Sequence, residues 1–292
     1  MNYLSYEFFQ LSLIGALLIG LIAPSVGIYL VQRKMSLIGD GIGHVALTGV
    51  AIGFLLKTSP VLTAVLVSAA GAVAIELIRE RAKASGDVAL AMLFYGGIAG
   101  GVVLISLSKQ GTNSTLQSYL FGSLNGTSRS DLTAMLILGA GVLGVTLLGR
   151  PWLFAVSQDE EHARVSGLPV RFLNVLLAVT TAVTVTTAMR AVGLLLVSAL
   201  MVVPVATAQQ VTRGFTTTLV AAMVIGVTVS GAGVLLAAEV DTPPGAFIVV
   251  LAVGLFVLVA AFASVLRRRR PVRAPNDTGH TEPPDVVLGP VT

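Results

Sequence analysis

Long apolar runs alternate with short polar segments along most of the chain. Each run has about the 20 residues that an α-helix needs to cross the hydrocarbon core of a membrane. The apolar residues are continuous within a run and do not alternate with polar ones, which excludes a transmembrane β-barrel. The pattern predicts nine spans, at about Phe8–Val31 (interrupted by Pro24), Met35–Leu56, Val61–Ile78, Val88–Leu107, Leu132–Leu148, Phe172–Ala188, Val192–Val211 (broken at Pro204), Thr217–Ala238 and Ala246–Leu266.

Composition places the chain in the same class. Of its 292 residues 55% are hydrophobic and only 11% are charged, and the mean hydropathy is +0.91. Soluble domains carry about 25% charged residues. We therefore expect an all-α, polytopic membrane protein with about eight or nine transmembrane helices. The chain has no cysteine, so any metal must be bound through oxygen and nitrogen. The net charge of +4 requires no nucleic-acid partner.

The distribution of lysine and arginine predicts the orientation, because cytoplasmic loops are enriched in both. With nine spans, most basic residues fall on one side, and the N-terminus is then outside and the C-terminus cytoplasmic. Residues 1–266 form the membrane domain. Residues 267–292 are expected to form a basic anchor and a disordered cytoplasmic tail. The predicted cytoplasmic cations are Arg33, Lys34, Arg79, Arg81, Lys83, those of Arg150–Arg171, Arg213 and Arg267–Arg270.

The second apolar run carries two polar side chains, Asp40 and His44. Four residues are one helical turn, so both lie on one face. At 1.5 Å per residue, Asp40 would lie about 8 Å and His44 about 14 Å from the cytoplasmic edge. A carboxylate with an imidazole suits a divalent transition metal, and two ligands alone would let an ion pass. The pair thus predicts a metal transit site. An Asp–His hydrogen bond, a bond from His44 to another helix, and a proton relay are the alternatives.

Glycines surround this pair in the same run. They should allow neighbouring helices to approach it closely. They occupy positions 39, 41, 43, 49 and 53.

The polar segment Ser157–Arg171 predicts a short capped helix on the cytoplasmic face. Ser157 and Glu160 have the spacing of a capping box, and Asp159, Glu160 and Glu161 favour the positive end of a helix dipole. Gly167 and Pro169 mark the end of the helix. A helix this short needs a surface on which to dock. The alternative is a plain cytoplasmic loop. His162 is expected to be a surface residue.

Two further places are candidates for a gate or a pathway. Pro204, with Thr207, Gln209 and Gln210, interrupts the seventh span as in the broken helices of transporters; an ordinary proline kink is the alternative. Glu239 and Asp241 precede Pro243-Pro244-Gly245 at the outer mouth and could attract a dication. The alternative there is a pair of solvated loop acids.

Several of these stretches resemble those of the bacterial zinc/manganese/iron ABC-transporter permeases. The chain is similar to that family in order from about Phe8 to Leu266. The segments that carry the resemblance are Arg33–Ala51, Asp159–Arg171, Val192–Ala208 and Asp241–Ala246.

The resemblance implies the membrane subunit of an ATP-binding-cassette importer, with a type II importer permease fold. Two such permeases would pair with a cytoplasmic ATPase dimer, and an extracytoplasmic solute-binding protein would deliver the metal. The family's pathway residues match Asp40 and His44, and Ser157–Arg171 would be the coupling helix that docks on the ATPase. The implied location is the bacterial plasma membrane.

No enzyme activity is expected of the chain itself. It has no phosphate-binding loop and no nucleophile–base arrangement, so a separate subunit would hydrolyse ATP. No permanently bound cofactor is expected; the cargo is Zn²⁺ or Mn²⁺, with iron as a third option. Two other functions stay open: a stand-alone, proton-coupled secondary transporter, and an importer of a metal chelate such as a siderophore.

Overall fold

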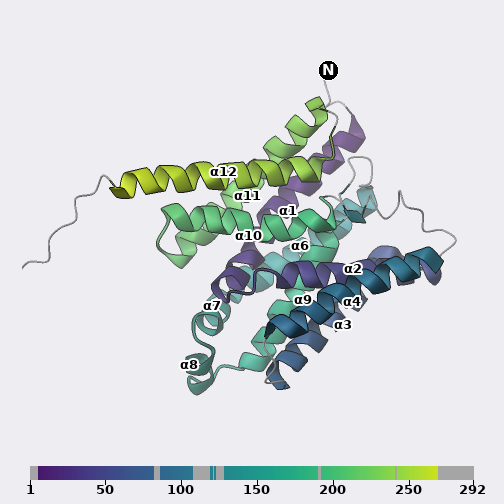
Figure 1. Cartoon of the computed structure of the whole chain (residues 1–292), viewed down its shortest axis with the longest axis horizontal. Coiled ribbons are helices and arrows are strands. Elements are labelled where there is room, and N and C mark those ends of the chain that lie inside the picture. The colour runs from purple at the N-terminus through teal and green to yellow at the C-terminus, as the bar shows by residue number, and fades with distance from the viewer. Residues whose placement is uncertain are drawn as a thin grey trace, which may run out of the picture.

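The computed structural model describes residues 6–81, 86–107, 119–120, 122, 128–189, 192–240 and 242–268. Within these ranges the regular structure is helical, and no strand occurs (Figure 1). The predicted all-α class is therefore confirmed. The helices are α1 (Glu7–Gln32), α2 (Ile38–Leu55), α3 (Pro60–Arg81), α4 (Gly86–Leu107), α6 (Arg129–Leu148), α7 (Arg150–Gln158), α8 (Glu160–Val165), α9 (Val170–Met189), α10 (Leu194–Val211), α11 (Phe215–Val240) and α12 (Pro244–Arg268).

Eight of these helices are long and apolar enough to cross a membrane, and α10 is a shorter apolar helix. This agrees with the expected eight or nine spans. Helices α1, α2 and α9 bury most of their residues inside the molecule, whereas α3, α4, α6 and α12 expose apolar side chains. Such exposed side chains suit contact with lipid, which is as apolar as they are. Of the predicted anchor and tail, residues 267–292, the first two positions belong to α12 and residues 269–292 lie outside the described residues.

Helices α1 and α10 cross the centre of the bundle in close contact, and neither is broken at its proline. Pro24 and Pro204 lie inside continuous helices, so the interruptions predicted at both positions are wrong. A proline removes only one backbone hydrogen bond, and neighbouring helices can hold the direction of the chain. Here, a Cβ atom added to Gly27 of α1 would collide with the carbonyl of Met201 on α10.

Glycines bring α2 against its neighbours, as the sequence predicts. A Cβ atom on Gly49 would lie 2.6 Å from Cα of Ala64 on α3. Helix α4 also packs closely against α2, because a Cβ atom on Gly97 of α4 would lie 2.7 Å from the backbone carbon of His44. Helix α2 is thus held between α3 and α4, with His44 at the closest approach to α4.

The corner before α2 has a fixed geometry. Lys34 has a φ of +57°, in the left-handed region. The amide of Met35 donates to the carbonyl of Leu30 over 2.9 Å, and that of Lys34 donates to Val31 over 3.1 Å. These two bonds form a Schellman motif, which ends α1. The corner therefore fixes where α2 begins relative to the end of α1.

Candidate functional site: a polar pair in α2 and the α8 segment

Asp40 and His44 lie on successive turns of α2, as predicted. Nε2 of His44 is 3.9 Å from Oδ1 of Asp40, too long for a hydrogen bond. The His44 side chain is 6% exposed and that of Asp40 is 25% exposed. The ring of Phe94 on α4 meets the imidazole edge-to-face, with ring centroids 4.4 Å apart. The direct Asp–His hydrogen bond, one of the alternatives, is therefore not formed.

Both imidazole nitrogens of His44 are buried and have no hydrogen-bond partner within the described part of the chain. The same holds for the hydroxyl oxygen of Ser198 on α10, which would lie 3.7 Å from a Cβ atom on Gly39, the residue before Asp40. Leaving a buried polar group unsatisfied costs about 1–3 kcal/mol. Such groups in a native structure therefore point to a missing partner, such as water or an ion.

The pair does not form a complete metal site by itself. The described residues hold no group of three or more histidine, cysteine, aspartate or glutamate side chains that could enclose an ion. Asp40, His44 and the Ser198 hydroxyl offer oxygen and nitrogen donors of the kinds that Mn²⁺, Fe²⁺ and Zn²⁺ accept. What the geometry offers is an open, partial coordination sphere.

The structure does not bring the other candidate pathway residues to this pair. Pro204 is buried inside α10, and the Thr207 hydroxyl donates to the carbonyl of Val203 in its own helix over 2.8 Å. Gln209 is exposed. Glu239, expected in a loop, lies exposed in the last turn of α11. Asp241 lies outside the described residues.

The segment Ser157–Arg171 contains a shorter helix than expected, with a different cap. Asp159 caps α8, its carboxylate accepting the amide proton of His162 over 2.9 Å. Ser157 instead belongs to α7, where its buried hydroxyl donates to Leu153 over 2.7 Å. The predicted Ser157–Glu160 capping box is therefore wrong. The physical reason is that α7 buries Leu153 and Val156 and continues past Ser157 to Gln158.

The predicted end of this helix is confirmed. Gly167 has a φ of +81°, and its amide donates to Arg164 over 3.1 Å. The amide of Leu168 donates to Ala163 over 3.1 Å, which completes a Schellman motif. Pro169 follows directly before α9. His162 is exposed, as expected.

Helix α8 lies at the edge of the bundle, beside the ends of α3 and α9 (Figure 1). It buries Ala163 and leaves Val165 88% exposed. Glu161 and Arg164 are exposed as well. A six-residue helix is poorly stabilised by itself, so α8 depends on its contacts with the bundle.

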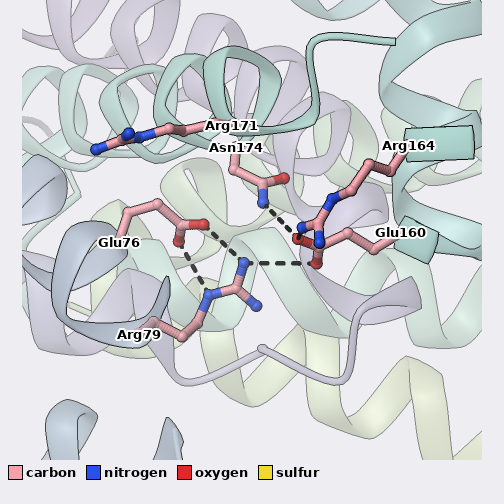
Figure 2. Close-up of a pocket in the computed structure, with 6 residues that line it drawn as sticks. All are labelled: Glu76, Arg79, Glu160, Arg164, Arg171 and Asn174. Atoms are coloured by element: carbon pink, nitrogen blue, oxygen red, sulfur yellow. Dashed lines mark hydrogen bonds and ion pairs between the residues drawn. The ribbon is translucent and has the colours of Figure 1, made fainter. Parts of the chain in front are cut away.

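Six side chains surround a cavity of about 250 Å³ between α8 and the bundle. Figure 2 shows Glu160 at the centre of these contacts, with Arg171 pointing away from the two carboxylates. Oε2 of Glu160 is 3.7 Å from Arg79, and Oε1 accepts a hydrogen bond of 3.1 Å from Asn174 and lies 3.6 Å from Arg164. We call this set the α8 cluster; it comprises Glu76, Arg79, Glu160, Arg164, Arg171 and Asn174.

The α8 cluster continues to the corner between α1 and α2. The guanidinium of Arg33 donates to Oδ1 of Asn174 in a very short hydrogen bond. Burial lowers the pKa of Arg33, and the charge of Arg79 lowers it further, whereas Glu160 and Glu76 raise it. Two carboxylates near a buried arginine thus offset part of the cost of its burial.

The sequence pattern does not single out Ser198, Glu76 or Asn174, because each lies inside an apolar run that predicts a membrane span. Glu76 and Asn174 carried a usable signal, because polar and ionisable side chains in membrane segments are rare and are paired or functional. Ser198 carried none, since serine is common in membrane helices and needs no partner beyond its own backbone.

Comparison with known proteins gives the family. A sequence model of the ABC 3 transport family matches residues 5–263. The manganese transport system membrane protein MntC of Halalkalibacterium halodurans is 33% identical over 260 residues, covering 89% of each chain. The chelated iron transport system membrane protein YfeD of Yersinia pestis is 32% identical, covering 88% of this chain and 86% of its own. The solved PsaBC complex of Streptococcus pneumoniae matches with a TM-score of 0.81 at 28% identity, over 91% of this chain and 97% of that chain.

The fold and the matched length define a multi-pass membrane protein of the transport-permease class. The chain belongs to the ABC 3 transport family. Its resemblance to the metal ABC-transporter permeases is thereby confirmed.

Proposed function

We propose that this chain is the membrane subunit of an ATP-driven importer of divalent transition metal ions, and that the ion passes Asp40 and His44. The observation that carries this proposal is the buried imidazole of His44, both of whose nitrogens lack a partner within the described residues. It stands one turn from the half-buried Asp40 carboxylate. An ionisable side chain in a membrane helix with no hydrogen-bond partner is expected to serve transport.

The distance within the pair supports a bound ion. Zinc–nitrogen and zinc–oxygen bonds are about 2.0–2.2 Å long, so two donor atoms on one tetrahedral ion lie about 3.4 Å apart. Nε2 of His44 and Oδ1 of Asp40 lie 3.9 Å apart. A small rotation of either side chain would let one ion touch both atoms without a change in the backbone of α2, and water, Ser198 or a second permease would supply the other ligands.

Manganese, iron and zinc are all compatible with this donor set. A relative named for manganese and another named for chelated iron support the first two. Zinc rests on ligand chemistry alone, because neutral imidazole with carboxylate accepts Zn²⁺ readily. We propose that the delivering solute-binding protein, and not the pair, selects among these ions.

We propose that α8 faces the cytoplasm and docks on a separate ATPase subunit. Its capped but short helix and its exposed Val165 support a docking role. The orientation is supported by arginines: Arg33, Arg79 and Arg164 all meet at this end of the molecule, and cytoplasmic ends are enriched in basic residues. The N-terminus would then be outside and the C-terminus cytoplasmic, in a bacterial plasma membrane. Two permeases and two ATPases would form the importer, with an extracytoplasmic solute-binding protein.

The test is uptake of Mn²⁺, Fe²⁺ and Zn²⁺ by vesicles that contain the assembled complex and ATP. Asp40→Ala and His44→Ala should each lower uptake at least about tenfold, since each removes one of two metal ligands. Thr228→Ala is the matched control, because its exposed hydroxyl bonds only its own helix. Uptake at the control level in both pair variants would reject the pathway.

Adding a siderophore or another strong chelator distinguishes the cargo. Uptake of a free ion should stop when the ion is chelated, whereas a chelate importer requires the chelator. The relative that is named for chelated iron transport is the reason to test this second function.

A further inference from the structure

The α8 cluster has two carboxylates, yet its contacts do not suit a metal ion. Arg79 holds the Glu76 carboxylate through two bonds, Nη2 to Oε1 at 2.6 Å and Nε to Oε2 at 3.2 Å. Glu160 meets Arg79, Arg164 and Asn174. Because guanidinium groups already occupy both carboxylates, a dication would find charge repulsion there. Its contacts instead connect α8 to α3 and α9.

Arg79 forms the first path of this connection. Its guanidinium is fixed by the buried Glu76, whose side chain is only 6% exposed. A bidentate, largely desolvated arginine–carboxylate pair has a defined geometry. From this position Arg79 reaches Glu160 of α8 and also contacts the sulfur of Met35, 4.0 Å from Nη1. Arg79 therefore touches both α8 and the corner before α2.

Asn174 forms the second path. It donates to Glu160 over 3.1 Å and accepts from Arg33. Arg33 and Met35 are the two neighbours of Lys34, the left-handed residue of the corner. Glu160 is thus connected to the same corner from both sides, through α3 and through α9.

The corner lies directly before the helix that carries Asp40 and His44. Its Schellman motif fixes residues 33–35, α2 begins at Ile38, and Asp40 is the third residue of α2. Helix α2 is one continuous hydrogen-bonded helix from Ile38 to Leu55, so its first turn and Asp40 belong to the same rigid element. A displacement of Glu160 would therefore move Asp40 relative to Ser198 on α10.

We propose that Glu160 is a positioning residue that transmits the movement of α8 to α2, and so opens or closes the coordination sphere at Asp40. This inference rests on the proposed docking of α8 on the ATPase and on the proposed passage of metal at the pair. In it, Arg79 and Asn174 both link Glu160 to the corner.

The test changes Glu160 and leaves Arg79 in place, because removal of Arg79 would strip the buried Glu76 of its cation and destabilise the fold. Glu160→Ala removes both paths. Glu160→Gln keeps an acceptor oxygen for Asn174 and loses the charge opposite Arg79. Glu7→Ala is the matched control, since it removes an exposed glutamate–arginine pair of 2.6 Å elsewhere, between Glu7 and Arg129.

Two readouts separate transmission from docking. The first is the number of metal ions taken up per ATP hydrolysed by the assembled complex. The second is the distance between two copies of a spin label at Leu37→Cys, an exposed site just before α2, measured with and without ATP. The absence of natural cysteines makes the label specific within this chain.

We expect Glu160→Ala to retain the ATPase subunit and its hydrolysis, to lose the ATP-dependent change at Leu37, and to lower the ions per ATP at least about fivefold, the lower end of typical coupling between sites. Glu160→Gln should fall between Glu160→Ala and the unchanged chain. Glu7→Ala should match the unchanged chain in both readouts.

Two results would overturn the inference: an unchanged Leu37 response with unchanged ions per ATP in Glu160→Ala, or loss of the ATPase subunit from that variant, which would place Glu160 in docking alone. Failure of the proposed function looks different. In that case the ATPase does not associate even with the unchanged chain, or Asp40→Ala transports normally.

Discussion

Nε2 of His44 stands 3.9 Å from Oδ1 of Asp40, one helical turn away, with no hydrogen bond between them. The Phe94 ring lies against the imidazole on the side of α4. This edge-to-face contact keeps water from that side of the ring. If the proposed passage of metal holds, two ligands would bind the ion weakly and release it, since a closed shell of four ligands would retain it.

Weak binding at the pair should be measurable as stabilisation. At a free Mn²⁺ or Zn²⁺ concentration of ten times the dissociation constant, the folded state should gain about 1.4 kcal/mol. The melting temperature of the purified complex should then rise by a few degrees, about 2–4 °C per kcal/mol for a chain of this size. His44→Gln and Asp40→Asn should abolish the rise. Mg²⁺, which prefers oxygen ligands, is the control ion. An equal rise in both variants would place the metal elsewhere.

Gly97 should be intolerant of a side chain and Gly96 tolerant. A Cβ atom on Gly97 would lie 2.7 Å from backbone atoms of His44 and Val45, whereas one on Gly96 would meet nothing within 4 Å. Gly97→Ala should therefore push α4 from α2, cost about 1–3 kcal/mol and reduce metal uptake. Gly96→Ala should be neutral or stabilise by about 0.5–1 kcal/mol through helix propensity. The melting temperatures of the two variants, measured by thermal denaturation, test this difference. Equal changes in both variants would contradict the close packing of α4 on α2 at Gly97.

Asp159, and not Ser157, should control the stability of α8. Asp159→Ala removes the cap bond to the His162 amide, at a cost of about 1 kcal/mol, which is about fivefold in the local opening equilibrium. Amide hydrogen exchange of residues 162–165 should accelerate accordingly. Ser157→Ala affects a bond within α7 only and should leave these rates unchanged. Faster exchange of α8 in Ser157→Ala would restore the capping box that the sequence predicts.

Gly167 should be required for its backbone conformation and not for space. Its φ is +81°, and an added Cβ atom would meet nothing within 4 Å. Gly167→Ala should cost about 1–2 kcal/mol and weaken association with the ATPase, because α8 would turn away from its position. Gly167→Asn should recover much of this loss, since asparagine tolerates the left-handed region. Gly141→Ala, in open space on α6, is the control. The measurements are the melting temperature and co-purification of the ATPase. If Gly167→Asn is as impaired as Gly167→Ala, the loss comes from the added side chain and not from the strained backbone conformation.

Sequence by itself determined the features that depend on neighbours along the chain. The spans follow from continuous apolar runs, and the shared face of Asp40 and His44 follows from their spacing of one turn. The end of α8 at Gly167 follows from glycine's access to positive φ. The start of α8 was not determined in this way, because Ser157 and Asp159 can both cap a helix and the choice depends on how far the preceding α7 extends.

Only the tertiary structure decided which side chains meet across helices. The Ser198 hydroxyl near Gly39 depends on how α10 is rotated against α2, and the Phe94 ring on His44 depends on the approach of α4 at Gly97. The contact between Arg33 and Asn174 joins residues 141 positions apart. Apolar runs specify that a helix is buried in a membrane, yet they leave its rotation and neighbours open, because lipid and the interior of the bundle are similarly apolar. Packing of glycine against backbone, and pairing of the few polar groups, fix what hydrophobicity leaves undetermined.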